Sequence, residues 1–263
     1  MPRYNITPEK SFAKTMPPLF RLNRFRQNAK INGSMKNIII TGASRGIGYD
    51  AAILLARQGH RVLALSRNEE SLKALKAEAG ERLDFLAFDL LQPDAEALIG
   101  KVKPMERVDI LINNAGYLLK KPFEEITATD WNRVFGVNFL GPAHLVQLLR
   151  PYLERSERAH ILNIGSMGGY QGSAKFPGLL GYSASKAAIA NLTECLAEEW
   201  KEKNVACNCL CLGAVQTEML AEAFPGFQAP VSAARMGAFI TYFATEGHHF
   251  FNGKVLPVSV STP

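Results

Sequence analysis

The sequence predicts a doubly wound α/β fold, in which about seven mainly parallel strands carry helices on both faces of the sheet. Short apolar runs such as Lys36–Thr41 show no alternation with polar residues, which is typical of strands buried on both faces. These runs alternate with segments of helical spacing such as Gly46–Gln58, the pattern of parallel strands joined by right-handed helical crossovers. The chain of 263 residues contains no internal repeat and no low-complexity linker, so we expect a single domain over residues 35–263.

The predicted elements follow one another in strand–helix order. The strands are compact and apolar, and we expect them at Lys36–Thr41, Arg61–Ser66, Leu83–Phe88, Val108–Asn113, His160–Gly165, Val205–Cys211 and Lys254–Ser259. The segments between them have helical spacing, and we expect helices at Gly46–Gln58, Glu69–Ala79, Asp94–Lys101, Thr129–Phe135, Gly141–Glu154, Tyr182–Lys203 and Ser232–Ala244. Ligands of such sheets bind outside the carboxyl ends of the strands.

The net charge of +6 belongs to the first 34 residues. That segment has seven Lys or Arg and one Glu (7 − 1 = +6), so the remainder carries 23 basic and 23 acidic residues. The body is therefore not a basic surface of the kind that binds nucleic acid. An Arg-rich, acid-poor start can be a mitochondrial targeting segment, but little amphipathic helix is visible. We favour a basic N-terminal extension over residues 1–34, or a natural start near Met35.

The four cysteines predict packing rather than metal binding. Cys207, Cys209 and Cys211 alternate, so a strand would point all three to one face, and Cys195 stands apart. No cluster of histidines accompanies them, as a zinc site would usually require. We expect small buried side chains, no metal and a reducing, cytoplasmic environment. No apolar run reaches the roughly 20 residues that span a bilayer, so we expect no membrane partner.

A glycine-rich turn joins the first strand to the first helix. Its sequence is Thr41-Gly42-Ala43-Ser44-Arg45-Gly46-Ile47-Gly48. Glycines allow a tight turn and the close approach of a ligand, and the start of the helix offers N–H groups to a pyrophosphate. At the first turn of a βαβ pattern, this predicts a Rossmann-type dinucleotide site.

The spacing Gly-x-x-x-Gly-x-Gly resembles that of the short-chain dehydrogenase/reductase family, and the likeness extends over about residues 36–260. Asp89-Leu90 resembles the adenine-contacting pair of that family, and Asn113-Asn114-Ala115-Gly116 resembles its NNAG motif, which stabilises the sheet near the adenosine ribose. Further cofactor contacts implied by the resemblance lie after the sixth strand, at Gly213, at the backbone of Val215 and at the hydroxyl of Thr217.

The end of the second strand bears on the choice of cofactor. An acidic residue there would bind the ribose 2′-hydroxyl and repel a 2′-phosphate, but this chain has Ser66-Arg67. Arg45 is a second candidate cation, and guanidinium suits phosphate through charge-assisted hydrogen bonds. We therefore predict NADP(H) over NAD(H), with a solvated Arg67 as the alternative reading.

Tyr182 and Lys186 are four residues apart, so on a helix they share one face. A free tyrosine has a pKa of about 10, and a nearby ammonium lowers it by favouring the phenolate. With Asn138 and Ser166, the pair matches the catalytic tetrad of the resembled family. The resemblance implies that Tyr182 exchanges a proton with the substrate oxygen, which Ser166 orients. It also implies that Lys186 holds the nicotinamide ribose and that Asn138 supports a water relay.

The resemblance implies an NAD(P)-dependent oxidoreductase that moves a hydride between NADP(H) and a carbonyl or alcohol, working as a homodimer or homotetramer. The alternatives are a non-catalytic dinucleotide sensor or scaffold on the same fold and, less favoured, epimerase or lyase chemistry. Leu212 stands where the family commonly has proline, so we expect a less rigid loop there. Met219, Leu220, Phe224 and Phe227 either line an apolar substrate pocket or pack in the core.

Overall fold

The structure, a computed structural model, describes residues 34–260, so the predicted basic extension lies almost entirely outside the described residues. Within this range seven strands form one sheet in the order β3-β2-β1-β4-β5-β6-β9, and every neighbouring pair is parallel. The strands are β1 (Asn37–Thr41), β2 (Arg61–Ser66), β3 (Leu83–Ala87), β4 (Ile110–Asn113), β5 (Ala159–Ser166), β6 (Val205–Leu212) and β9 (Val255–Val258). The predicted fold class is confirmed.

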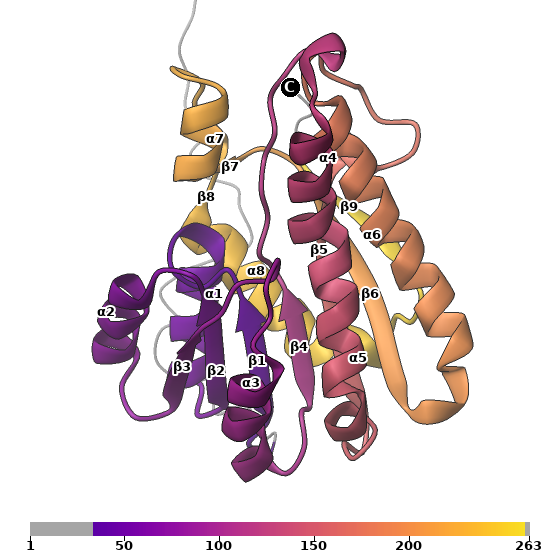
Figure 1. Ribbon diagram of the computed structural model, residues 1–263. Coiled ribbons are helices and arrows are strands. Elements are labelled where there is room, and N and C mark those ends of the chain that lie inside the picture. The colour runs from indigo at the N-terminus through magenta and orange to yellow at the C-terminus, as the bar shows by residue number, and fades with distance from the viewer. Residues whose placement is uncertain (1–33, 261–263) are drawn as a thin grey trace, which may run out of the picture. The chain divides into compact units, whose positions relative to one another are not determined.

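Helices cover both faces of the sheet (Figure 1). The helices of the described residues are α1 (Gly46–Arg57), α2 (Glu69–Ala79), α3 (Ala95–Val102), α4 (Ala128–Phe135), α5 (Gly141–Leu153), α6 (Leu180–Glu199), α7 (Glu218–Ala223) and α8 (Ala233–Glu246), of which α7 lies beyond the carboxyl edge of the sheet. Ile38 and Ile40 of β1 pack into one core layer with α1, α2 and α8, whereas Ile39 packs into the other with α3, α5 and α6. Both faces of the strand are buried, which explains its unbroken apolar sequence.

The order of the strands reverses beside β1. The chain runs from β1 outward to β3 and then returns to β4, on the other side of β1. The loops that leave β1 and β4 therefore diverge, and they open a crevice at the carboxyl ends of the strands. Among the described residues, no helix combines the length and apolar character needed to cross a bilayer.

A π-helical turn, η5 (Gly136–Leu140), joins α4 to α5 and was not predicted. It packs closely on the segment after β3. A Cβ on Gly136 would lie 2.4 Å from Leu91 Cδ2, and one on Gly141 would lie 2.7 Å from Leu90 Cβ. The turn thus depends on tertiary contacts, and such turns often occur at functional sites.

Other differences from the prediction are small and lie at the carboxyl edge of the sheet or at helix ends. The helix predicted over Tyr182–Lys203 begins at Leu180 and ends at Glu199, and a 3₁₀ turn, η7 (Lys201–Lys203), follows. Three short elements were missed in the segment after β6. They are α7 and the two paired strands β7 (Val215–Gln216) and β8 (Val231–Ser232).

Candidate active site

A pocket of about 560 Å³ lies at the carboxyl ends of the strands. Every residue predicted to bind the cofactor lines it, namely Gly42, Ser44, Arg45, Gly46, Ile47, Gly48, Ser66, Arg67, Asp89, Leu90, Asn114, Ala115, Gly116, Tyr182, Lys186, Gly213, Val215 and Thr217. Ser166 also lines the pocket, whereas Asn138 is buried behind it. Predicted residues from seven separate segments of the chain therefore meet around one cavity.

The glycine-rich turn forms a cradle that only glycine fits. Gly42 and Gly46 have φ of 69° and 59°, which side chains disfavour. A Cβ on Gly42 would lie 2.7 Å from Ala115 Cα, and one on Gly48 would lie 2.4 Å from Asn114 Nδ2. Among the described residues no side chain caps the start of α1, and its first turn holds no acidic residue. The turn therefore fits the pyrophosphate of a dinucleotide.

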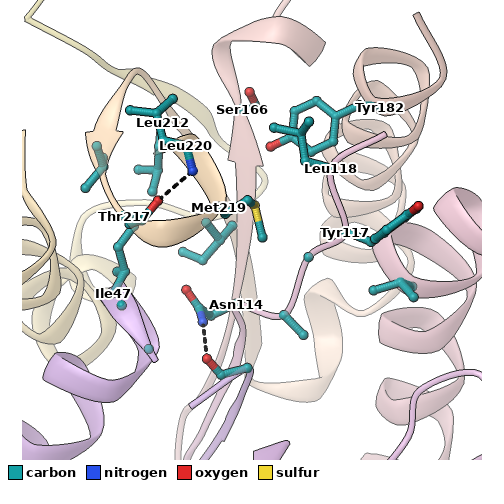
Figure 2. Close-up of a pocket in the computed structure, with 18 of the residues that line it drawn as sticks. Ile47, Asn114, Tyr117, Leu118, Ser166, Tyr182, Leu212, Thr217, Met219 and Leu220 are labelled. Atoms are coloured by element: carbon teal, nitrogen blue, oxygen red, sulfur yellow. Dashed lines mark hydrogen bonds between the residues drawn. The ribbon is translucent and has the colours of Figure 1, made fainter. Parts of the chain in front are cut away.

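Hydrogen bonds from the NNAG motif fix the shape of this cradle. Asn114 Nδ2 donates to the carbonyl oxygens of Thr41 (3.0 Å) and Gly42 (3.1 Å), and one such contact is drawn in Figure 2. The Thr41 hydroxyl accepts from the backbone N–H groups of Asn114 and Ala115. Asn113 Nδ2 donates to Asn163 Oδ1 on β5 at 2.8 Å. The motif thus ties the loop after β4 to the loop after β1 and to the sheet.

The two predicted cations differ in their surroundings. Arg45 Nη1 lies 3.2 Å from Glu222 Oε1 of α7, and both side chains are more than half exposed. Arg67 is exposed at the end of β2, next to Ser66. Asp89 turns back on its own loop, where its carboxylate accepts from the N–H of Leu91 at 2.9 Å. The end of β2 therefore carries the guanidinium group of Arg67 and no carboxylate. The guanidinium group of Arg45, in the glycine-rich turn, is paired with Glu222.

Ser166, Tyr182 and Lys186 gather where β5 meets the first turns of α6. Ser166 ends β5, and the side chains of Ser166 and Tyr182 both line the pocket. Figure 2 shows these two side chains next to Leu118. The Lys186 ammonium lies 6.0 Å from the centre of the Tyr182 ring and donates to the Ile164 carbonyl at 2.7 Å. A phenol and a buried ammonium thus face the same cavity as the cradle.

The pKa of Tyr182 departs from the expectation. Burial raises it above its usual value, while the neighbouring Ser166 hydroxyl acts in the opposite direction. The net direction of the shift is therefore opposite to the lowering that we predicted from Lys186, because burial has the largest effect. Burial also lowers the pKa of Lys186 to about 8, while the neighbouring Cys209 and Cys211 act in the opposite direction. Burial thus makes Lys186 easier to deprotonate than a lysine in water.

Asn138 sits in the π-helical turn and braces two parts of the site. Its Oδ1 accepts from the N–H of Tyr117 at 2.7 Å, and its Nδ2 donates to the Tyr117 carbonyl and to the Ser185 hydroxyl, both at 2.9 Å. Ser185 lies between Tyr182 and Lys186 on α6. The amide thus links the loop after β4 to the helix that carries Tyr182 and Lys186.

The segment after β6 forms one wall of the pocket. Met219, Leu220, Phe224 and Phe227 all line the cavity, so the pocket reading of these residues is favoured over core packing. The opposite wall contributes further apolar side chains, which are Leu118, Met167, Phe176 and Leu179. Sequence reasoning missed Leu118, because nothing in the sequence places the loop after β4 opposite α7.

Lys120 also lines this wall and was not predicted. Its ammonium donates to the Ala223 carbonyl at 2.8 Å and lies 4.5 Å from the centre of the Phe224 ring. A cation at the last carbonyls of a helix is favourable, so Lys120 stabilises the end of α7.

The loop after β6 is held at its start by strand pairing, although Leu212 stands where the family commonly has proline. Leu212 is paired with Val258 of β9, and the N–H of Gly213 donates to the Val258 carbonyl at 2.9 Å. Thr217 caps α7, since its hydroxyl accepts from the N–H of Leu220 at 3.2 Å (Figure 2). Strand pairing and this cap hold the segment where the family commonly uses proline.

The cysteines and histidines lie outside the pocket lining. Cys207, Cys209 and Cys211 are buried free thiols on β6, as predicted, and Cys195 is exposed. His160 and His248 are buried among described residues at the other end of the sheet, where His160 Nδ1 lies 2.9 Å from the Ala244 carbonyl oxygen. Both imidazoles therefore lie away from the pocket.

Comparison with known proteins gives a consistent picture. The profile of a family described as short chain dehydrogenase matches residues 36–226. The chain is 36% identical to gluconate 5-dehydrogenase of Gluconobacter oxydans over 188 residues, which cover 69% of this chain and 72% of that enzyme.

Two solved structures share the fold. ElxO with NADP bound has a TM-score of 0.76 and 26% identity, with 86% of this chain and 98% of that one covered. The 3-ketoacyl-(acyl-carrier-protein) reductase from Brucella melitensis complexed with NADH has a TM-score of 0.78 and 24% identity, with 85% and 96% covered. One relative in fold thus holds NADP and the other holds NADH.

Proposed function

The chain belongs to the short-chain dehydrogenase/reductase family and is an NAD(P)-dependent oxidoreductase, and we propose that it uses NADP(H) to interconvert an apolar carbonyl compound and its alcohol. One observation carries the proposal. The Tyr182 and Ser166 side chains line the same cavity as the glycine cradle, and the buried Lys186 ammonium lies 6.0 Å from the centre of the Tyr182 ring. A dinucleotide in the cradle and a carbonyl group at Tyr182 would then be neighbours.

In the direction of reduction, the Tyr182 phenol donates its proton to the carbonyl oxygen, and the Ser166 hydroxyl holds that oxygen in place. A nicotinamide cofactor, when bound, would supply the hydride that this reduction requires. Lys186 would hold the ribose of that cofactor, and its positive charge favours the phenolate that remains on Tyr182. Asn138 keeps α6 and the loop after β4 in register through its bonds to Tyr117 and Ser185. The water relay suggested for Asn138 stays a prediction.

The preference for NADP(H) rests on the charge at the end of β2. Ser66 and Arg67 replace the acidic residue that would repel a 2′-phosphate, and Arg45 lies on the same rim. Measurement of KM for NADPH and NADH with one carbonyl substrate tests this preference. We expect a lower KM for NADPH, and a clear preference for NADH would overturn this part of the proposal.

The apolar character of the substrate rests on the two walls of the pocket, which carry Leu118, Phe176, Met219 and Phe224 among others. A panel of ketones, aldehydes and acyl thioesters, graded in size and polarity, should be screened by the consumption of NADPH. We expect kcat/KM to rise with apolar surface. Equal turnover of small polar carbonyls and bulky apolar ones would contradict the substrate class.

We also infer a homodimer or homotetramer that works in the cytoplasm. Large apolar side chains are exposed on α8 and after it, where Tyr242 is 61% and Phe250 is 77% exposed. Such a patch often marks a protein interface. The free thiols of β6 are those expected in a reducing compartment. Light scattering coupled to gel filtration tests the oligomeric state, and a monomer at micromolar concentration would contradict it.

A further inference from the structure

Two adjacent residues of the short helix α7, Glu222 and Ala223, are bound by side chains from two other segments of the pocket rim. The Glu222 carboxylate pairs with Arg45 of the glycine-rich turn at 3.2 Å. The next residue, Ala223, accepts from Lys120 of the loop after β4 at 2.8 Å, and Lys120 also lies over the Phe224 ring. Because Arg45, Glu222 and Lys120 all line the cavity, these contacts join three segments of its rim.

The first of these contacts involves a group that the cofactor would also use. Arg45 is one of the two cations proposed to meet the 2′-phosphate of NADP(H), and in the structure its guanidinium already has a carboxylate partner. A guanidinium that turns toward a phosphate must give up part of its contact with Glu222. NADH carries a hydroxyl at the same position and makes no such demand.

We propose that Glu222 is a specificity-determining residue, which competes with the 2′-phosphate of the cofactor for Arg45 and thereby weakens the binding of NADP(H) but not of NAD(H). The inference rests on the proposed use of Arg45 for NADP(H). Glu222 acts in two ways, since it holds Arg45 away from the phosphate and adds a negative charge to the same rim. The chain would thus limit its own preference for the phosphorylated cofactor.

The exposure of the pair sets the size of the effect. The side chains of Arg45 and Glu222 are 53% and 68% exposed, so solvent screens the contact and Arg45 can exchange partners. Exposed ion pairs of this kind correspond to about a 2- to 5-fold change in an equilibrium constant. The position of α7 does not depend on this pair alone, because Lys120 and the Thr217 cap hold the helix independently.

Calorimetric titration of the protein with NADPH and with NADH measures Kd for each cofactor and tests the proposal without any turnover. The variant is Glu222→Gln, and the matched control is Glu199→Gln, an exposed carboxylate at the far end of α6 from Tyr182. We expect Glu222→Gln to lower Kd for NADPH by about 2- to 5-fold and to leave Kd for NADH unchanged. Glu199→Gln should change neither value. Equal shifts for both cofactors, or no shift at all, would overturn the proposal.

A double-mutant cycle with Arg45→Gln separates competition from simple repulsion. Arg45→Gln alone should raise Kd for NADPH, and in its presence Glu222→Gln should have a smaller effect than in the wild type. An undiminished effect would show that Glu222 does not act through Arg45. These binding data stand apart from the catalytic proposal, since a protein without carbonyl turnover would still report the competition. A wild type that prefers NADH would overturn the cofactor choice alone.

Discussion

Gly165 is the position at which a single methyl group should disturb the site most. It lies on β5 opposite Cys211, immediately before Ser166. A Cβ at Gly165 would lie 2.8 Å from Cys209 Sγ and 2.9 Å from Cys211 Sγ, well inside ordinary contact distances. Both thiols are fully buried, so neither sulfur can swing into solvent. The substitution Gly165→Ala must therefore shift β5 or β6.

Overpacking of this kind costs about 1–3 kcal/mol of the free energy of unfolding. For a domain of this size each kcal/mol corresponds to roughly 2–4 °C, so we expect the Tm to fall by about 2–12 °C. We also expect kcat to fall, because Ser166 and the Ile164 carbonyl that holds Lys186 flank the substitution. Thermal unfolding followed by circular dichroism and turnover of one carbonyl substrate measure the two effects.

Removal of the two sulfur atoms should restore part of the stability that the added methyl group costs. Gly165→Ala combined with Cys209→Ala and Cys211→Ala should be more stable than the sum of the separate effects predicts. Gly100→Ala is the matched control, since its Cβ would meet no atom within 4 Å in α3. That substitution should leave the Tm unchanged or raise it. An unchanged Tm in Gly165→Ala, or strict additivity with the cysteine variants, would refute the packing explanation.

Two further predictions concern buried polar groups. Burial lowers the pKa of His160 to about 4 and that of His248 to about 3, whereas the unfolded rings have the ordinary value near 6.5 and bind protons first. Their contribution to stability is therefore complete above pH 6.5 and lost as the pH falls, by up to roughly 3 kcal/mol from His160 alone near pH 4. Urea unfolding at a series of pH values checks this, and a constant free energy of unfolding from pH 7 to 4.5 would contradict it. Asn114→Ala removes the two donors that fix the glycine cradle, so Kd for NADPH should rise about 10-fold or more, as calorimetry would measure. Unchanged affinity in that variant would mean that the cradle holds its shape without Asn114.

The features that sequence reasoning found are those in which neighbours along the chain determine the outcome. Apolar runs between helical segments predicted all seven strands of the sheet, since a strand buried on both faces has few polar residues. The glycine turn and the Tyr182–Lys186 spacing are also local patterns. Each became part of one pocket, because the carboxyl ends of parallel strands lie on the same edge.

The features that could not be predicted from the sequence depend on contacts between segments that are distant along the chain. The π-helical turn follows from the packing of Gly136 against Leu91, which are far apart in the sequence. The raised pKa of Tyr182 follows from burial, which spacing on a helix does not reveal. The pair of Arg45 with Glu222 joins residues 177 positions apart. The cap at Thr217, followed by Glu218, was a readable signal for α7, although six residues make a weak helical pattern.

The central claim is that Tyr182 transfers the proton, and the substitution Tyr182→Phe tests it most directly. The variant keeps the ring and loses only the hydroxyl, so we expect kcat to fall by roughly 10²- to 10⁴-fold. The Kd for NADPH should stay within about twofold of the wild type, because the glycine cradle is untouched. Tyr170→Phe, a tyrosine outside the pocket lining, should retain wild-type turnover. Wild-type turnover in Tyr182→Phe would contradict the assignment of the proton donor.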